Sequence, residues 1–262
     1  MEELAKKYCF LRSLEYSLPR DPKEVTESKP GLFFVFVDAL EHGLRLPLPT
    51  FAIAILRHYQ IHHSMLQAQS WGFIIGFLVR CLETGVTATV GLLREFHSVN
   101  ASPGKRGFYF KSRVSQAKKL LVEPTKSVKG WRGRYFIVRN LLGFTPCPWC
   151  NSLDTQRLNQ RKTLSEAEKI DLVKLSALAP EEVNSVVWED RLRQVRLSMS
   201  SSQQARLDEE EEVYTGTERG GVQDTRDEPM SSVVIEGESR IKPSSGYNVF
   251  VFYFKLSFLT YF

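Results

Sequence analysis

The sequence predicts a mainly α fold of the α+β class, with a compact helical core of about four short helices, then a small antiparallel sheet, a helical pair and a disordered tail. Apolar residues recur every three or four positions between residues 32 and 97, as in helices buried on one side. Short aromatic and β-branched runs follow at Gly107–Arg113 and Arg134–Arg139, as in strands. From Ser198 the chain is rich in Ser, Gln, Glu, Gly and Asp, a composition too polar to form a core.

A proline-rich turn is expected to separate the first two core helices. The first should occupy residues 32–40 and end at Gly43, which can adopt a left-handed conformation. Pro47 and Pro49 disfavour helical backbone at the residue before each, so helix cannot propagate through this turn. Thr50 then caps the second helix. Two further core helices are expected at residues 68–84 and 89–97.

The second half of the chain mixes strands and helices. We expect Gly107–Arg113 and Arg134–Arg139 to pair with each other in the antiparallel sheet, with a helix over Val114–Val122 between them. Residues 163–177 should form a helix, because Thr163 to Glu166 has the pattern of a capping box. A second helix is expected from Pro180 to Leu197, since proline favours the first helical turn.

These expectations divide the 262 residues into six segments. They are an N-terminal approach segment (1–30), a core domain (31–146), a linker (147–162), a helical pair (163–197), a disordered acidic and polar region (198–245) and an aromatic C-terminal tail (246–262).

Positive charge is concentrated in one part of the chain. The net charge is +5, but Val99 to Arg139 holds eleven Lys and Arg residues and a single acid, Glu123. Aromatic residues lie between these cations, as in surfaces that track a phosphate backbone and stack bases. The candidate nucleic-acid-binding residues are Lys111, Arg113, Lys129, Arg132 and Arg134. The alternative is that the aromatic residues form core and the charges only solvate the surface.

Two motifs suggest metal or redox chemistry and neither is complete. Cys147 and Cys150 form a C-x-x-C pair, but no Cys or His follows them to complete a zinc site. His58 and His62 have the spacing of a zinc-binding helix, yet Tyr59 stands where a metalloprotease has its glutamate. We therefore interpret the two cysteines as loop thiols and assign no metal ligand.

No nucleotide-binding, nucleophile or protease motif is present, so we predict a protein that is not an enzyme and has no cofactor, no small-molecule substrate and no catalytic residue. The apolar stretch Trp71–Leu93 carries Arg80 and Glu83, which is costly in lipid, so no membrane span is expected. Four unevenly spaced cysteines and the lack of a signal peptide favour the cytoplasm or nucleus over secretion.

Several motifs, in order, carry a resemblance to a known family. They are LEYSLPRDP, GLRLPLPTF, the pattern W-x4-GF-x3-C-x3-GV beginning at Trp71, then GFYFKSR and KGWRGRYFIV. In this order they resemble the plant putative gypsy-type transposon family, the Gag-like domains of plant long-terminal-repeat retrotransposons. The resemblance covers Tyr8 to Pro146; after it the chain departs from the longer coiled-coil continuation typical of the family.

The resemblance implies an ancestry and a fold, and it brings no catalytic residues. The function expected is that of a non-enzymatic, retrotransposon-derived Gag-like protein that self-associates and binds RNA or DNA weakly through a basic face. Two alternatives are a domesticated protein–protein interaction module that uses the helical pair, and a transposon remnant without a selected function.

Overall fold

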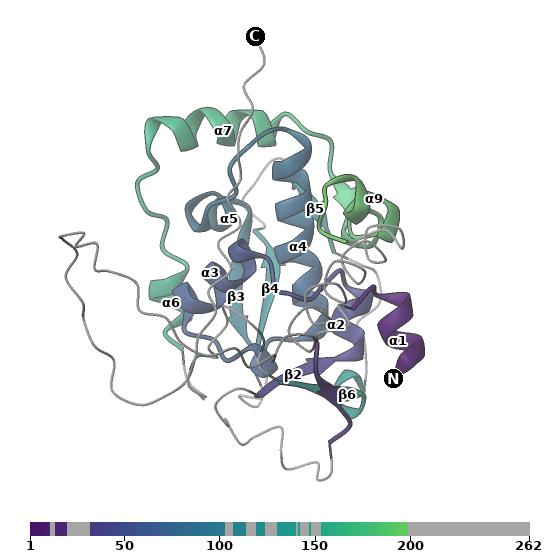
Figure 1. The fold of residues 1–262 in the computed structure, drawn as a ribbon. Helices are drawn as coiled ribbons and strands as arrows, with labels where there is room; N and C mark the ends of the chain where they lie inside the picture. The colour runs from purple at the N-terminus through teal and green to yellow at the C-terminus, as the bar shows by residue number, and fades with distance from the viewer. Residues whose placement is uncertain are drawn as a thin grey trace, which may run out of the picture. The chain divides into compact units, whose positions relative to one another are not determined.

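The computed structural model describes residues 1–10, 14–19, 32–102, 107–113, 119–123, 130–139, 141, 147 and 153–198 (Figure 1). The chain separates into two units, Met1–Arg219 and Gly220–Phe262, and every described residue belongs to the first. The segment predicted to be disordered and the aromatic tail lie outside the described residues.

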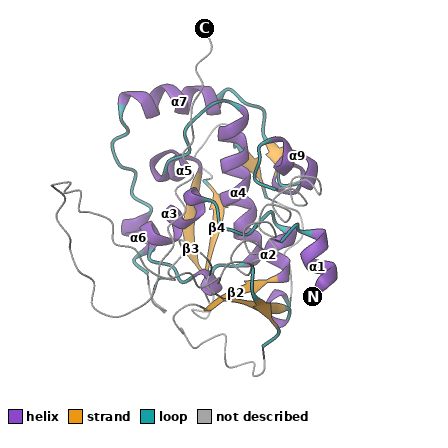
Figure 2. Cartoon of the chain, in the orientation of Figure 1, coloured by secondary structure: helices purple, strands orange, loops and turns teal. Residues whose placement is uncertain are grey.

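The first unit contains both helices and strands (Figure 2). The α-helices are α1 (Glu2–Lys7), α2 (Val37–Glu41), α3 (Thr50–Tyr59), α4 (Ala68–Glu83), α5 (Val90–Phe96), α6 (Thr155–Leu158), α7 (Glu166–Ser176), α8 (Val183–Val186) and α9 (Glu189–Gln194). The strands are β1 (Tyr16–Ser17), β2 (Leu32–Phe36), β3 (His97–Ala101), β4 (Phe108–Ser112), β5 (Leu121–Val122), β6 (Tyr135–Arg139) and β7 (Glu181–Glu182). Short 3-10 helices span His63–Met65 and Trp131–Gly133.

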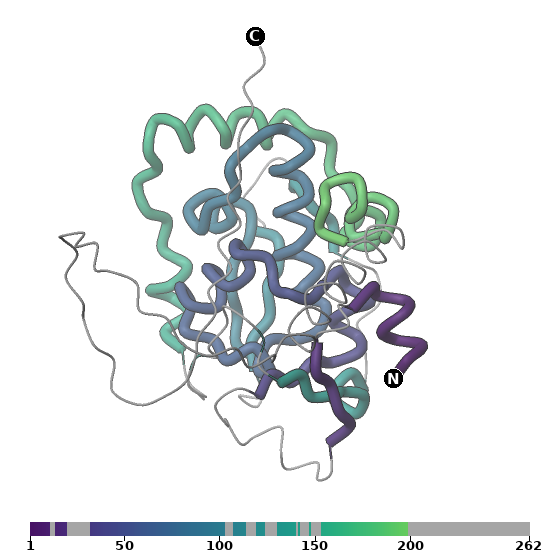
Figure 3. Tube along the Cα trace, viewed as in Figure 1, coloured from purple at the N-terminus to yellow at the C-terminus, as the bar shows by residue number. Residues whose placement is uncertain are grey.

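The core is built around α4, which runs through the middle of the trace (Figure 3). This helix is buried on nearly all sides: among the residues buried in it are Trp71, Phe73, Ile74 and Phe77. A helix that is apolar all round must be covered all round, and α4 contacts α2, α3, α8, β4 and β5. The core helix predicted after Thr50 is therefore present as α3, and those predicted at 68–84 and 89–97 are present with ends that agree to within one residue.

Three small sheets surround these helices. The first has the order β1-β6-β2 and is antiparallel, with Phe34 opposite Ile137. The second is the hairpin of β3 and β4, in which Val99 lies opposite Phe110. The third pairs β5 with β7 in parallel. The α+β class predicted from the sequence is thus confirmed.

The predicted pairing of the two aromatic strands is wrong. Strand β4 pairs with β3, whereas β6 pairs with β1 and β2. The β3–β4 pairing closes only a short connection, which costs less chain entropy than a distant pairing. Strand β6 instead joins segments about 100 residues apart, a pairing that local pattern does not reveal.

The helix predicted over residues 32–40 is half strand. Leu32–Phe36 is β2, and only the residues from Val37 are helical. Four consecutive residues of β2 are buried, because its two faces are covered, and such an apolar run has no period that distinguishes strand from helix. The end of the segment was predicted correctly, since Gly43 has a φ of 88° and follows α2.

The remaining differences lie in the second half. Leu121 and Val122, expected in a helix, are extended in β5. The capping box of α7 uses Ser165 and Glu168 in place of Thr163 and Glu166, so the helix begins three residues later than predicted. Thr50 does not cap α3; Pro49 holds that position.

The helix expected from Pro180 to Leu197 is divided into β7, α8 and α9, and ion pairs dock it on α4. Arg191 donates to Glu83 at 2.9 Å and to Glu181 at 3.1 Å, and Arg80 donates to Glu181 and, at 3.1 Å, to the carbonyl of Ala179. The hydrogen bond from Arg191 lowers the pKa of Glu181. These partly buried contacts fix Glu181 and Arg191 against α4, and the segment between them does not form one continuous helix.

Among the described residues, no helix is both long enough and apolar enough to cross a membrane.

Candidate nucleic-acid interface

The five residues proposed from the sequence do not form one row. Lys111 lies on β4 and Arg113 directly follows this strand, whereas Arg132 and Arg134 precede or flank β6. Because β4 and β6 belong to different sheets, the two residues at β4 and the two residues at β6 form separate pairs. Lys129 lies outside the described residues.

Arg113 is held by backbone carbonyls. Its Nε donates to the carbonyl of Arg94 at 2.6 Å and to that of His97 at 3.2 Å, and its Nη2 donates to the carbonyl of Asn159 at 2.6 Å. Burial lowers the pKa of this guanidinium, and the nearby Arg161 adds to the effect. Arg113 therefore braces α5, β3 and the chain after α6.

The pair near β6 is also engaged. Arg134 Nη2 lies 3.0 Å from Asp38 Oδ1, a carboxylate that is almost completely buried in α2. The guanidinium of Arg132 lies over the ring of Trp131 at 4.9 Å, and this ring packs edge-on against Phe36. For this half of the proposal, the contacts favour the alternative in which the aromatic residues are core.

A different group of cations gathers around Arg113, and sequence reasoning missed it. The residue pair Asn159 and Val99 anchors the chain after α6 to β3, since the Asn159 side chain accepts from the Val99 N–H at 2.9 Å and donates to its carbonyl at 2.7 Å. This places Arg161 near Glu95, with Nε 3.2 Å from Oε2. We call Arg94, Arg113, Arg161 and Lys162 the basic cluster.

The basic cluster has more positive than negative charge. The charges that act on Arg113 include the cations Arg94 and Arg161 and the carboxylate Glu95; Lys162 and Arg94 both lower the pKa of His58, after the larger effect of its burial. Four cations therefore face one carboxylate. The cluster extends from a buried Arg94 to Arg161, whose side chain is 49% exposed, and an exposed Lys162.

Sequence reasoning could have found part of this cluster. Gln160-Arg161-Lys162 was assigned to a linker, although it is a short basic run before a helix. Arg94 was counted as a member of an apolar helix, and nothing in its neighbours indicates that it is buried. The spatial link through Asn159 depends on tertiary structure and has no local signal.

The cysteine and histidine motifs occupy buried positions. Cys147 is buried and its Sγ lies 3.6 Å from the carbonyl of Leu56; burial raises its pKa. Cys150 lies outside the described residues. His63 Nε2 accepts a hydrogen bond from the N–H of Phe34 at 3.0 Å, and burial lowers the pKa of His62 to about 4. Within the described ranges, no three His, Cys, Asp or Glu side chains gather as metal ligands would.

Comparison with known proteins gives one match. Residues 34–101 match the family model described as putative gypsy type transposon; no curated protein and no solved structure matches the chain. The matched segment begins within β2 and ends with β3, so it contains α2 to α5 and the proline-rich turn. The resemblance stated from the sequence is confirmed over this segment: residues 34–101 are similar to the putative gypsy type transposon family.

Proposed function

We propose that this chain is a non-enzymatic, transposon-derived protein of the Gag-like kind that binds single-stranded nucleic acid through the basic cluster. The relation to the gypsy-type family supports a transposon origin. The observation that carries the binding function is the excess of cations in the basic cluster: Arg94 and Arg161 act on Arg113, Lys162 acts on His58, and Glu95 is the one carboxylate among the described groups that act on either.

The chemistry suits a phosphate backbone. Exposed cations release counterions when they neutralise phosphates, which gives affinity without sequence preference. Arg161 and Lys162 are exposed and Lys111 is half-exposed on β4, so solvent, and with it a ligand, has access to each of these side chains. The ion pair of Arg161 with Glu95 does not prevent this, because a pair at this exposure contributes only about 0 to 1 kcal/mol.

The test is fluorescence anisotropy with a labelled single-stranded RNA at low salt. Neutralising the exposed cations in R161Q/K162Q should weaken binding about tenfold through the loss of two phosphate contacts. The matched control is K169Q/K174Q, which removes the same charge from α7, where both lysines pair with acids of their own helix. Equal binding by the two double variants would refute the role of the basic cluster.

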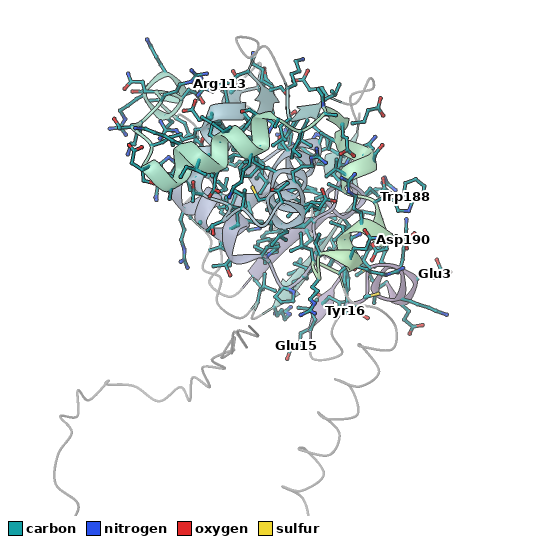
Figure 4. All side chains as sticks on the ribbon, turned by 90° about the horizontal axis from the view of Figure 1, so that it is seen from above. Glu3, Glu15, Tyr16, Arg113, Trp188 and Asp190 are labelled. Atoms are coloured by element: carbon teal, nitrogen blue, oxygen red, sulfur yellow. The ribbon has the colours of Figure 1, made fainter. Side chains whose placement is uncertain are left out.

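A protein–protein interaction module is the second candidate, and one observation favours it. Trp188 at the start of α9 is 68% exposed, and Figure 4 shows it directed away from the fold. Ile170 and Val173 on α7 are exposed as well. Exposed tryptophan is enriched at the centres of protein interfaces, and this surface could serve either self-association or a foreign partner. Light scattering of wild type and W188A would test it: an oligomer that the variant loses supports this second candidate, and identical masses reject self-association through Trp188.

A further inference from the structure

Arg94 is a buried arginine that lacks an acceptor. The residue is 3% exposed, its Nε is buried without a hydrogen-bond partner, and no hydrogen bond or ion pair joins its side chain to the described residues. Nε of two other buried arginines, Arg45 and Arg80, lacks a partner as well, but their terminal nitrogens are bound. Those of Arg45 donate to Glu189 and to the carbonyls of Leu40 and Leu44, and those of Arg80 donate to Glu181. A buried guanidinium normally has a carboxylate or several carbonyls as partners, so Arg94 has the donors of a binding site and no internal ligand.

Two other donors without partners lie beside Arg94. Tyr59 is completely buried and its hydroxyl has no partner, and Nε2 of His58 is buried without a partner as well. Both residues end α3, which packs on α5, and their rings are 4.9 Å apart. The charge of Arg94 lowers the pKa of His58 and opposes the rise, to about 12, that burial causes in the pKa of Tyr59. The charge of Arg94 in α5 therefore acts on two unpartnered groups at the end of α3, the helix on which α5 packs.

The carboxylate of the neighbouring residue, Glu95, has another partner. Glu95 follows Arg94 in the chain, and its carboxylate pairs with Arg161. Arg113 and Lys162 add positive charge around the same region. An external ligand for this region must accept several hydrogen bonds and carry negative charge.

We propose that His58, Tyr59 and Arg94 form a phosphate-binding site. A phosphate group has enough oxygens to accept from the guanidinium, the phenol hydroxyl and an imidazole N–H together, and arginine binds phosphate in a bidentate manner. A carboxylate would leave part of this donor set without an acceptor. Lys162 is exposed and its charge acts on His58, so we expect the phosphate to enter from the side of Lys162.

The first experiment is titration calorimetry with inorganic phosphate at constant ionic strength and pH 7. Wild type should bind one phosphate, R94M should bind none, and Y59F should bind at least several-fold more weakly. The control is R57M, which removes an exposed arginine from the same helix as His58 and should bind as wild type does. If wild type and R94M give the same heats, the site does not exist.

A second readout covers the case in which R94M changes the fold. The histidine resonances of the wild-type chain can be followed by NMR during a pH titration with and without phosphate. A bound anion offsets the charge of Arg94, so the pKa of His58 should rise in phosphate while that of the buried His97 stays low. No change at His58 would contradict the proposal even if R94M proved unstable.

The phosphate can belong to a nucleic-acid strand or be free in solution, and only the first case depends on the proposed function. If a strand occupies the site, inorganic phosphate should displace labelled RNA from wild type at constant ionic strength, and R94M should bind RNA more weakly. If RNA binding is indifferent to phosphate while calorimetry still shows one bound phosphate, the site takes free phosphate. Loss of RNA binding in R161Q/K162Q with phosphate binding retained would separate the basic cluster from the phosphate site.

Discussion

Replacing Gly72 by alanine should destabilise the fold, although alanine is the better helix former. Gly72 lies in the middle of α4, where the exchange would otherwise stabilise by about 1 kcal/mol. A Cβ at this position, however, would come closer than 3.0 Å to Cγ1 of Val183 in α8. Overpacking of this kind costs about 1 to 3 kcal/mol, so we expect a net loss of about 1 kcal/mol in the free energy of unfolding, measured by urea denaturation.

A double-mutant cycle isolates the cause. Val183 is completely buried, and V183A alone should cost about 2 kcal/mol. In the G72A background the same change relieves the overlap, so its cost should fall by about 1 kcal/mol or more. G133A is the control, because no atom lies within 4 Å of the added Cβ. If G72A stabilises the protein and the two substitutions add, then α8 does not pack on α4 as described.

Three further predictions concern buried polar groups. R134Q should cost about 1 kcal/mol in urea denaturation, because it leaves the buried carboxylate of Asp38 without its cation while solvent screens part of the loss. Burial lowers the pKa of His97 to about 3; its contribution to stability is therefore full above pH 6.5 and falls by about 1.4 kcal/mol per pH unit between pH 6.5 and about pH 3. H97F should reduce the slope by this amount, whereas His58, His62 and His63, whose pKa values burial also lowers, keep their own contributions. Iodoacetamide should label Cys9 before Cys147, whose pKa is raised by burial.

Each of these has a result that would contradict it. Adding D38N should recover part of the loss in R134Q, and a larger loss in the double variant would mean that the ion pair is not the cause. The His97 prediction fails if H97F keeps the wild-type dependence of stability on pH between 6.5 and 5. Rapid labelling of Cys147 in the folded chain, read by peptide mass spectrometry, would show that this thiol is accessible.

Periodic segments of the fold were predictable, and tertiary pairing was not. The helix over Ala68–Glu83 follows from apolar spacing and ends before Gly85. Leu32–Phe36 was misassigned because a run buried on both faces has no period. The partner of β6 was misassigned because β2 lies about 100 residues away, and no local pattern records such a pairing.

The candidate site was only partly predictable, because sequence shows charge and not burial. The basic stretch indicated Arg113 and Arg134 as ligand-binding residues, yet in the structure Arg113 donates to backbone carbonyls and Arg134 pairs with Asp38. The sequence gives no reason to single out Arg94, which lies among apolar residues of a helix. Only the structure shows that its Nε is buried without a hydrogen-bond partner. Arg161 reaches the same region through Asn159, a contact that joins residues 60 positions apart.

The salt dependence of RNA binding tests the central claim most directly. If the exposed Arg161 and Lys162 and the half-exposed Lys111 contact about three phosphates of a single strand, the logarithm of the affinity should fall with the logarithm of salt with a slope of about −2. The slope for R161Q/K162Q should be close to −1, and that for K169Q/K174Q should remain near −2. A slope that is the same for all three proteins, or affinity that does not depend on salt, would contradict the account.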